Sequence, residues 1–326
     1  MAKLLGESIQ LGIGSEATRG TPVAPAHWVP ARTPTGIRPV LEKVLIRETR
    51  ATKMASQASE IVQKRAEGDV EFNVRNESIG HILKSLLGSV ATTNPETDVY
   101  QHVFSLLLNN PQHPTCTLAL HQPGYQDYRF PFAIVNSLEL RTPVNELVNA
   151  TASFIASEEQ EQSDYTPATA EDDHYFRNHE VTIKLADDAD GLGAASTLKV
   201  KEFSLGMNNG ARADYNVGDL SPSDMLVMLL EITGSMQIDY EGKTYHDIFT
   251  SGAYRAMRIE MVRNIDIGDG LNPRITIDLP KISFENLDPN RPMDDIVRDG
   301  ISFNAHYDDE EAEGVSVTVV NNHASY

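Results

Sequence analysis

The chain has 326 residues, of which 40% are hydrophobic and 23% charged, and its formal net charge is −20. This length predicts about two domains with ordinary cores and excludes disorder throughout. Residues 1–150 contain 14 Lys/Arg and 14 Asp/Glu, and the remaining 13 Lys/Arg and 33 Asp/Glu lie in residues 151–326. A surface of this charge repels phosphate, which argues against tight nucleic-acid binding.

The sequence has one cysteine, Cys116, so it can form no disulfide within the chain and suits a reducing compartment. The N-terminal residues lack the long apolar core of a signal peptide, and the apolar runs are too short to span a bilayer. We therefore expect the protein to be made in the cytoplasm and to stay soluble. Cys116 alternates with Leu118 and Leu120, which predicts a small core residue and not a nucleophile.

Residues 1–40 are dense in helix and strand breakers, which predicts an extended N-terminal arm without a core of its own. These breakers are Gly12, Gly14, Gly20, Pro22, Pro25, Pro30, Pro34 and Gly36.

A first β domain is expected over residues 41–157. Val70, Phe72 and Val74 alternate with polar residues, as in a half-buried strand. A helix is predicted near residues 77–87 from the apolar spacing of the next segment, with Asn76 as its N-cap. Further strands are predicted at 99–108, 115–121, 130–141 and 147–156.

Residues 158–174 are polar and acidic, and they predict a linker. A second β domain is expected over 175–308, followed by a C-terminal tail at 309–326. Its first strand and its helix near 243–251 match the strand and helix of the first domain when residue numbers are shifted by a constant amount. In this alignment Gly68 corresponds to Gly234. Later strands are predicted at 253–262, 274–286 and 299–307. We interpret the chain as two tandem copies of a β-sandwich or barrel, each with one flanking helix.

Motifs for catalysis or cofactor binding were not found. There is no phosphate-binding glycine loop, no serine nucleophile elbow and no zinc-protease signature. The turn at residues 187–191 lacks two of the oxygen ligands that a calcium-binding EF-hand loop requires. We expect no enzyme activity, no cofactor and no metal.

Three stretches resemble the tail tube proteins of bacteriophages with long non-contractile tails. They are residues 16–23 (EATRGTPV), residues 67–72 (EGDVEF) with the helix ending at Leu87-Gly88, and residues 135–140 (VNSLEL) with 150–154 (ATASF). The resemblance covers nearly the whole chain and depends on the order and spacing of these segments.

This resemblance implies a structural virion protein whose copies form stacked rings around a channel for DNA. In such proteins a long hairpin contacts the neighbouring ring, and residues 41–74 are the candidate here, with the tip at 47–59. The candidate contact residues are Arg47, Glu48, Arg50, Lys53, Gln57, Gln63, Lys64 and Arg65. Expected partners are other copies of the chain and the tape-measure, terminator and tip proteins of the tail, with DNA only in transit and no membrane.

If a ring needs six barrels and each chain supplies two, then three chains complete it, with the charge alternating from barrel to barrel. Six chains with one domain projecting outward is the alternative. Two other functions stay open. One is a tail-tip or connector protein built on the same barrel, and the other is a β-sandwich module that binds carbohydrate or a cell surface. The single tryptophan, Trp28, argues against sugar binding because it lies in the proline-rich arm.

Overall fold

The computed structural model describes residues 3–33, 36–168, 173–240, 242–294 and 296–326. The protein is mainly β, as the alternating sequence predicts, and two α-helices lie in the described part of the chain. Parts of the expected N-terminal arm (1–2 and 34–35) and of the expected linker (169–172) lie outside the described residues.

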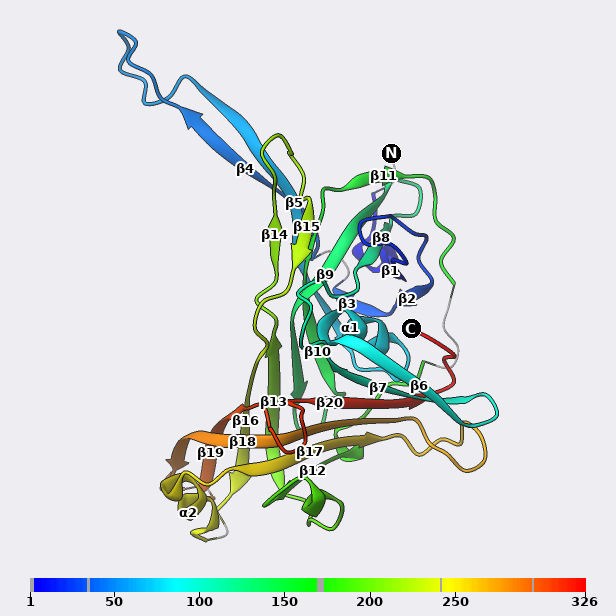
Figure 1. Cartoon of the computed structure of the whole chain (residues 1–326), viewed down its shortest axis with the longest axis vertical. Coiled ribbons are helices and arrows are strands. Elements are labelled where there is room, and N and C mark those ends of the chain that lie inside the picture. Colours follow the sequence, from blue (N-terminus) through cyan, green and yellow to red (C-terminus); the bar gives the residue numbers. More distant parts are fainter. Residues whose placement is uncertain (1–2, 34–35, 169–172, 241, 295) are drawn as a thin grey trace.

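Elements of the first half come in the order of the sequence prediction, with additional strands before the predicted hairpin. Their bounds are β1 Gln10–Ser15, β2 His27–Val29, β3 Ala31–Thr33, β4 Arg38–Ile46, β5 Ala58–Asn73, α1 Ser78–Leu87, β6 Gly88–Glu96, β7 Val99–Leu106, β8 Cys116–His121, β9 Asp127–Thr142, β10 Asn149–Ala156 and β11 Gln160–Gln162. Six of these strands hydrogen-bond in the antiparallel order β4–β5–β10–β9–β8–β1 (Figure 1).

The second half repeats this strand order. Its bounds are β12 Val181–Ala186, β13 Val200–Asn208, β14 Arg212–Asp214, β15 Asp224–Leu226, β16 Glu231–Asp239, α2 Thr244–Ser251, β17 Arg255–Val262, β18 Arg274–Asn290, β19 Arg298–Ala305 and β20 Ser316–Asn321. Six of them pair antiparallel in the order β13–β16–β19–β18–β17–β12. Helix α2 follows β16 as α1 follows β5.

Agreement between the halves extends to single residues. Gly68 of β5 pairs with Phe154 of β10, and Gly234 of β16 pairs with Phe303 of β19. The two glycines therefore occupy corresponding positions in the two strand sets, and so do the two phenylalanines. A β-bulge lies beside each phenylalanine, in the β9–β10 and β18–β19 ladders respectively. The two halves thus share strand order, direction and bulge position.

Two connections join the halves. The C-terminal part of β9 has β10 on one edge and β13 on the other, which gives a continuous run β4–β5–β10–β9–β13–β16–β19–β18. Strand β20 pairs with β18 on one side and with β7 on the other. The expected C-terminal tail therefore contains a strand, because Val315, Val317 and Val319 alternate with polar residues and are buried.

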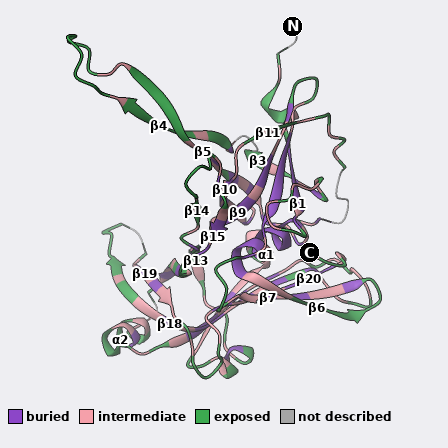
Figure 2. Ribbon diagram, turned by 45° about the horizontal axis from the view of Figure 1, so that its top comes forward, coloured by how far each residue is buried: buried purple, intermediate pink, exposed green. Residues whose placement is uncertain are grey.

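The hydrophobic core extends through the strands of both halves and includes the face of α1, nine of whose ten residues are buried, whereas α2 buries only Ile248 (Figure 2). Asn76 was wrong as the N-cap of α1. The first turn begins after Glu77, and Asp173 caps it by accepting hydrogen bonds from the backbone N–H of Glu77 at 2.9 Å and of Ser78 at 3.2 Å. A carboxylate so distant in the sequence can do this because the free N–H groups and the helix dipole favour a negative charge there.

The N-terminal region differs from the expected arm. Leu11 and Ile13 of β1 are buried in the core, because β1 lies between β2 and β8. In the expected linker, β11 pairs with β9. No helix in the described part of the chain is long and apolar enough to cross a membrane.

Candidate assembly surfaces

The β4–β5 hairpin extends away from the body of the protein and is exposed on both faces (Figures 1 and 2). Its apolar residues do not alternate strictly with polar ones. Both faces of the hairpin therefore carry apolar side chains that are exposed to water. The exposed large apolar residues are Leu41, Val44, Leu45, Met54, Ile61 and Val62. An exposed two-stranded ribbon of this kind gains little stability alone, and its apolar side chains make it a candidate contact surface.

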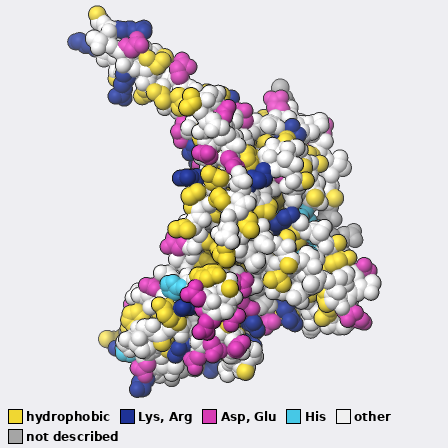
Figure 3. Space-filling view, in the orientation of Figure 1, with side chains coloured by type: hydrophobic (Ala, Val, Ile, Leu, Met, Phe, Trp, Pro, Cys, Tyr) yellow, Lys and Arg dark blue, Asp and Glu magenta, His cyan; other side chains and the backbone are white. Residues whose placement is uncertain are grey.

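Five of the predicted hairpin residues lie at or beside the tip. The tip is closed by Gln57, which accepts a hydrogen bond from the backbone N–H of Glu48 at 2.9 Å and donates one to the carbonyl of Glu48 at 3.0 Å. Arg50 forms an ion pair with Glu48, while Arg47 and Lys53 are exposed. The tip is therefore net positive, as the dark blue side chains at the end of the hairpin show (Figure 3).

The other three predicted residues lie lower on β5. Lys64 donates its backbone N–H to the carbonyl of Leu220 at 2.8 Å, and its Nζ lies 3.2 Å from Glu158 Oε2. Arg65 pairs with Glu42 across the hairpin at 2.7 Å, and Gln63 pairs with Glu42 in the ladder. Lys64 therefore attaches the hairpin to the loop between β14 and β15. The sequence did not predict that hairpin, since its two strands are very short.

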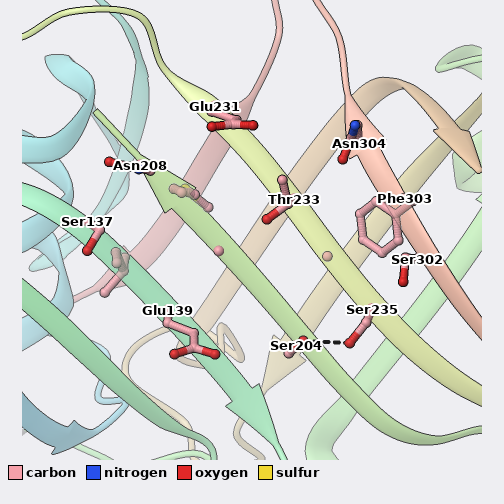
Figure 4. Close-up of a pocket in the computed structure, with 14 residues that line it drawn as sticks. Ser137, Glu139, Ser204, Asn208, Glu231, Thr233, Ser235, Ser302, Phe303 and Asn304 are labelled. Carbon is pink, nitrogen blue, oxygen red and sulfur yellow. Dashed lines mark hydrogen bonds between the residues drawn. The ribbon is translucent and has the colours of Figure 1, made fainter. Parts of the chain in front are cut away.

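A polar surface covers the face of the sheet that is turned away from the core. Side chains of β9, β13, β16 and β19 line a hollow of about 620 Å³ there, and Figure 4 shows the hydroxyl groups of Ser204 and Ser235 hydrogen-bonded at 2.8 Å across two strands. We call this surface the polar face. Its small uncharged members are Ser137, Ser204, Asn208, Thr233, Ser235, Ser302 and Asn304.

Both halves place carboxylates on this face, with Glu139 from the first half and Glu231 from the second half beside the hollow (Figure 4). Asp69, Glu71 and Glu139 lie on it by their register with β10, and only Glu139 has an arginine beside it, Arg141 at 2.8 Å. On the second half, Asp239 is neutralised by Lys201 at 3.1 Å and by Arg298 at 3.4 Å.

Two strand edges at opposite ends of the continuous run have no partner strand among the described residues. Strand β4 pairs only with β5. Strand β18 has β17 along its first half, but its residues 286–290 pair only with β19. The equivalent part of β9 is occupied by β13.

Residues 16–23, which open the chain's resemblance to tail tube proteins, form a buried anchor. Glu16 is 7% exposed and accepts hydrogen bonds from the backbone of Gly20 and Phe132 and from the hydroxyls of Thr115 and Thr117, at 2.6–2.8 Å. All four donors thus reach one carboxylate, which fixes the loop after β1 against β8 and β9.

Arg19 of the same motif connects the two halves. It donates to the carbonyl of His113 and forms a 2.6 Å ion pair with Asp224 of β15. Burial disfavours the charged form of Asp224, but hydrogen bonds from Gln112 and Arg19 outweigh it and hold the pKa of the Asp224 carboxyl below its usual value. The motif therefore serves packing and positioning.

Cys116 is 3% exposed, as predicted for a core residue, and burial raises the pKa of its thiol. Among the described residues, no group of three or more His, Cys, Asp or Glu side chains is placed to hold a metal ion.

A family model described as phage tail tube protein matches residues 6–305 of the chain. This match spans both strand sets, both helices and the long hairpin. No curated protein matches the sequence.

Proposed function

Because the chain belongs to the phage tail tube protein family, we propose that its copies assemble into stacked rings that form the tube of a bacteriophage tail. In this role the chain is a structural component of the virion tail, assembled in the host cytoplasm, and it performs no catalysis. Its other partners are the tape-measure, terminator and tip proteins of the tail.

A ring in this proposal contains three chains. The observation that carries it is the β9–β13 junction, at which the first strand set meets the second edge to edge. The matching strand order of the halves supports a duplication of one unit, whose six strands span residues 10–156 in the first copy and 181–305 in the second. If the same junction repeats between chains, three chains place six units around a closed ring. The junction inside each chain then forms at high effective concentration.

The polar face lines the channel in this arrangement. Hydroxyl and amide side chains present no cations to replace the counterions of DNA, and the carboxylates of the first half repel phosphate. Carboxylates of both units, Glu139 of the first and Glu231 of the second, face the channel in this arrangement.

The β4–β5 hairpin couples one ring to the next. Its exposed apolar residues and positive tip need a covering surface, and the ordering of a long loop costs roughly 1–2 kcal/mol per residue, which a contact must offset. The second half of the chain, with its excess of Asp and Glu, supplies a surface of opposite charge.

Electron microscopy of the concentrated, purified chain tests the proposed function. Rings and tubes of uniform width are expected. A chain that stays monomeric at high concentration and across salt conditions would contradict the proposal.

A further inference from the structure

We infer that the free edge of β18 in one copy pairs antiparallel with β4 of the next copy in a single register, with Arg38 opposite Asp288. The inference rests on the proposed ring and adds to it the strands and residues of the contact between chains. To derive it, we match β4 to β13 and β18 to β9, residue by residue, and assume that the free edges of β4 and β18 pair between copies as β13 and β9 pair within the chain.

Strand β4 corresponds to β13. In the second half, Gly206 of β13 pairs with Thr233 of β16. In the first half, Arg38 of β4 pairs with Glu67 of β5. Thr233 and Glu67 are equivalent because each directly precedes the glycine of its repeat, Gly234 or Gly68. Arg38 is therefore the counterpart of Gly206.

Strand β18 corresponds to β9. Glu139 of β9 pairs with Thr151 of β10, and Asp288 of β18 pairs with Gly300 of β19. Thr151 and Gly300 are equivalent because each precedes the phenylalanine of its strand, Phe154 or Phe303, by the same number of positions. Asp288 is therefore the counterpart of Glu139, and the bulges beside the phenylalanines keep the two registers equal.

Within the chain, Gly206 lies opposite Glu139. Transferred to the contact between chains, this pairing sets Arg38 opposite Asp288. Both side chains are exposed, and neither has an ion-pair partner among the residues that the structure describes. A guanidinium opposite a carboxylate favours this register, whereas a slip by one residue would put the two side chains on opposite faces of the sheet.

The edges also suit this pairing chemically. An exposed edge strand has a row of unpaired backbone N–H and C=O groups, to which a further strand can hydrogen-bond. A closed ring of strands has no such edge. The occupant of each free edge is thus a second copy of this chain, because only the chain's own β4 and β18 reproduce the junction already present between β13 and β9.

Cysteine crosslinking tests the register. Paired residues in an antiparallel ladder have Cα atoms about 4.5–5.5 Å apart, which is within disulfide range. The variant Arg38→Cys/Asp288→Cys is assembled into tubes, oxidised and separated on a non-reducing gel. The buried Cys116 contributes no reactive thiol. Linked species of two and three chains are expected, with none larger from a single ring.

The matched control is Glu42→Cys/Asp288→Cys, in which one cysteine lies further along β4 and roughly 13 Å from its target. It is expected to crosslink about tenfold less or not at all. Tubes of the first variant that yield only monomers, or equal crosslinking of both variants, would overturn the register while leaving the proposed function intact. If the unmodified chain forms no tubes, the proposed function fails, and the register fails with it.

A charge exchange gives a second test if the cysteine variant does not assemble. Arg38→Glu and Asp288→Arg are each expected to lower the yield of tubes, and the double variant Arg38→Glu/Asp288→Arg to restore it. A double variant no better than the worse single variant would overturn the pairing.

Discussion

Gly234 lies directly opposite Phe303 in the β16–β19 ladder, and a Cβ atom at Gly234 would lie 2.2 Å from Cζ of the phenylalanine ring. The ring thus occupies the space above the glycine. In the first half Gly68 lies opposite Phe154, but there the backbone of Gly36 approaches the glycine, at 2.0 Å from the position of a Cβ. At the two corresponding positions, the missing side chain of glycine thus makes room for a phenylalanine ring in the second half and for a backbone segment in the first half.

Replacing Gly234 with alanine is expected to destabilise the monomer by about 1–3 kcal/mol, the usual cost of overpacking a core. The midpoint of urea unfolding, at unchanged slope, measures this loss. Gly206→Ala on the neighbouring strand is the control, since a Cβ there would lie no closer than 3.5 Å to any neighbouring group and should change stability little. Equal effects of the two substitutions would show that the close contact with Phe303 does not matter.

Glu16→Ala is expected to cost about 3 kcal/mol, because four buried donors lose their common acceptor. Thermal unfolding of the monomer provides the measurement. The exposed Glu7→Ala serves as the control and should leave the melting temperature unchanged. A stable Glu16→Ala protein would refute the role of this carboxylate as an anchor.

His81 predicts a loss of stability in acid. Burial, followed by the nearby His27, His323 and Lys84, lowers the pKa of His81 to about 3, and Asp173 opposes this effect. The unfolded chain binds this proton below pH 6.5 and the folded chain does not. Stability is therefore present above pH 6.5 and falls by about 1.4 kcal/mol per pH unit between pH 6.5 and pH 3.

The variant His81→Phe keeps an aromatic ring against Tyr326, whose centroid lies 4.9 Å away, and has no group to protonate. Its unfolding free energy should fall less steeply over this pH range than that of the unmodified chain. Identical slopes would mean that other groups, such as the carboxylate of Asp173, account for the acid sensitivity.

Replacement of the hairpin tip, residues 47–57, by an Asn-Gly turn should leave the monomer folded but prevent tube growth, because the contact between rings is lost. The unfolding midpoint of the shortened monomer is the control and should match that of the full chain. Tubes of normal yield and length would show that another element couples the rings.

Periodicity predicted the elements that follow local rules. The strand of Val70 and Phe72, the helix after it and their counterparts from Gly234 onward agree with the structure, because the spacing of their apolar residues is visible in a short window. Strand β13 carries the same alternation in Phe203, Leu205 and Met207 but was not predicted.

Features that depend on distant residues could not be predicted this way. The cap of α1 by Asp173, the ion pair of Arg19 with Asp224 and the pairing of β9 with β13 each join segments that are far apart along the chain. The sequence around Asn76 and around Asp173 does not indicate which of the two side chains caps α1. The eight candidate contact residues lie on the β4–β5 hairpin, but the sequence did not reveal that Lys64 contacts the β14–β15 loop.

Image reconstruction of assembled tubes, with the symmetry left free, tests the central claim most directly. We expect three chains per ring, six alternating units around the channel, the polar face inward and β18 of each chain beside β4 of the next. Six chains per ring with the second unit projecting outward would contradict it.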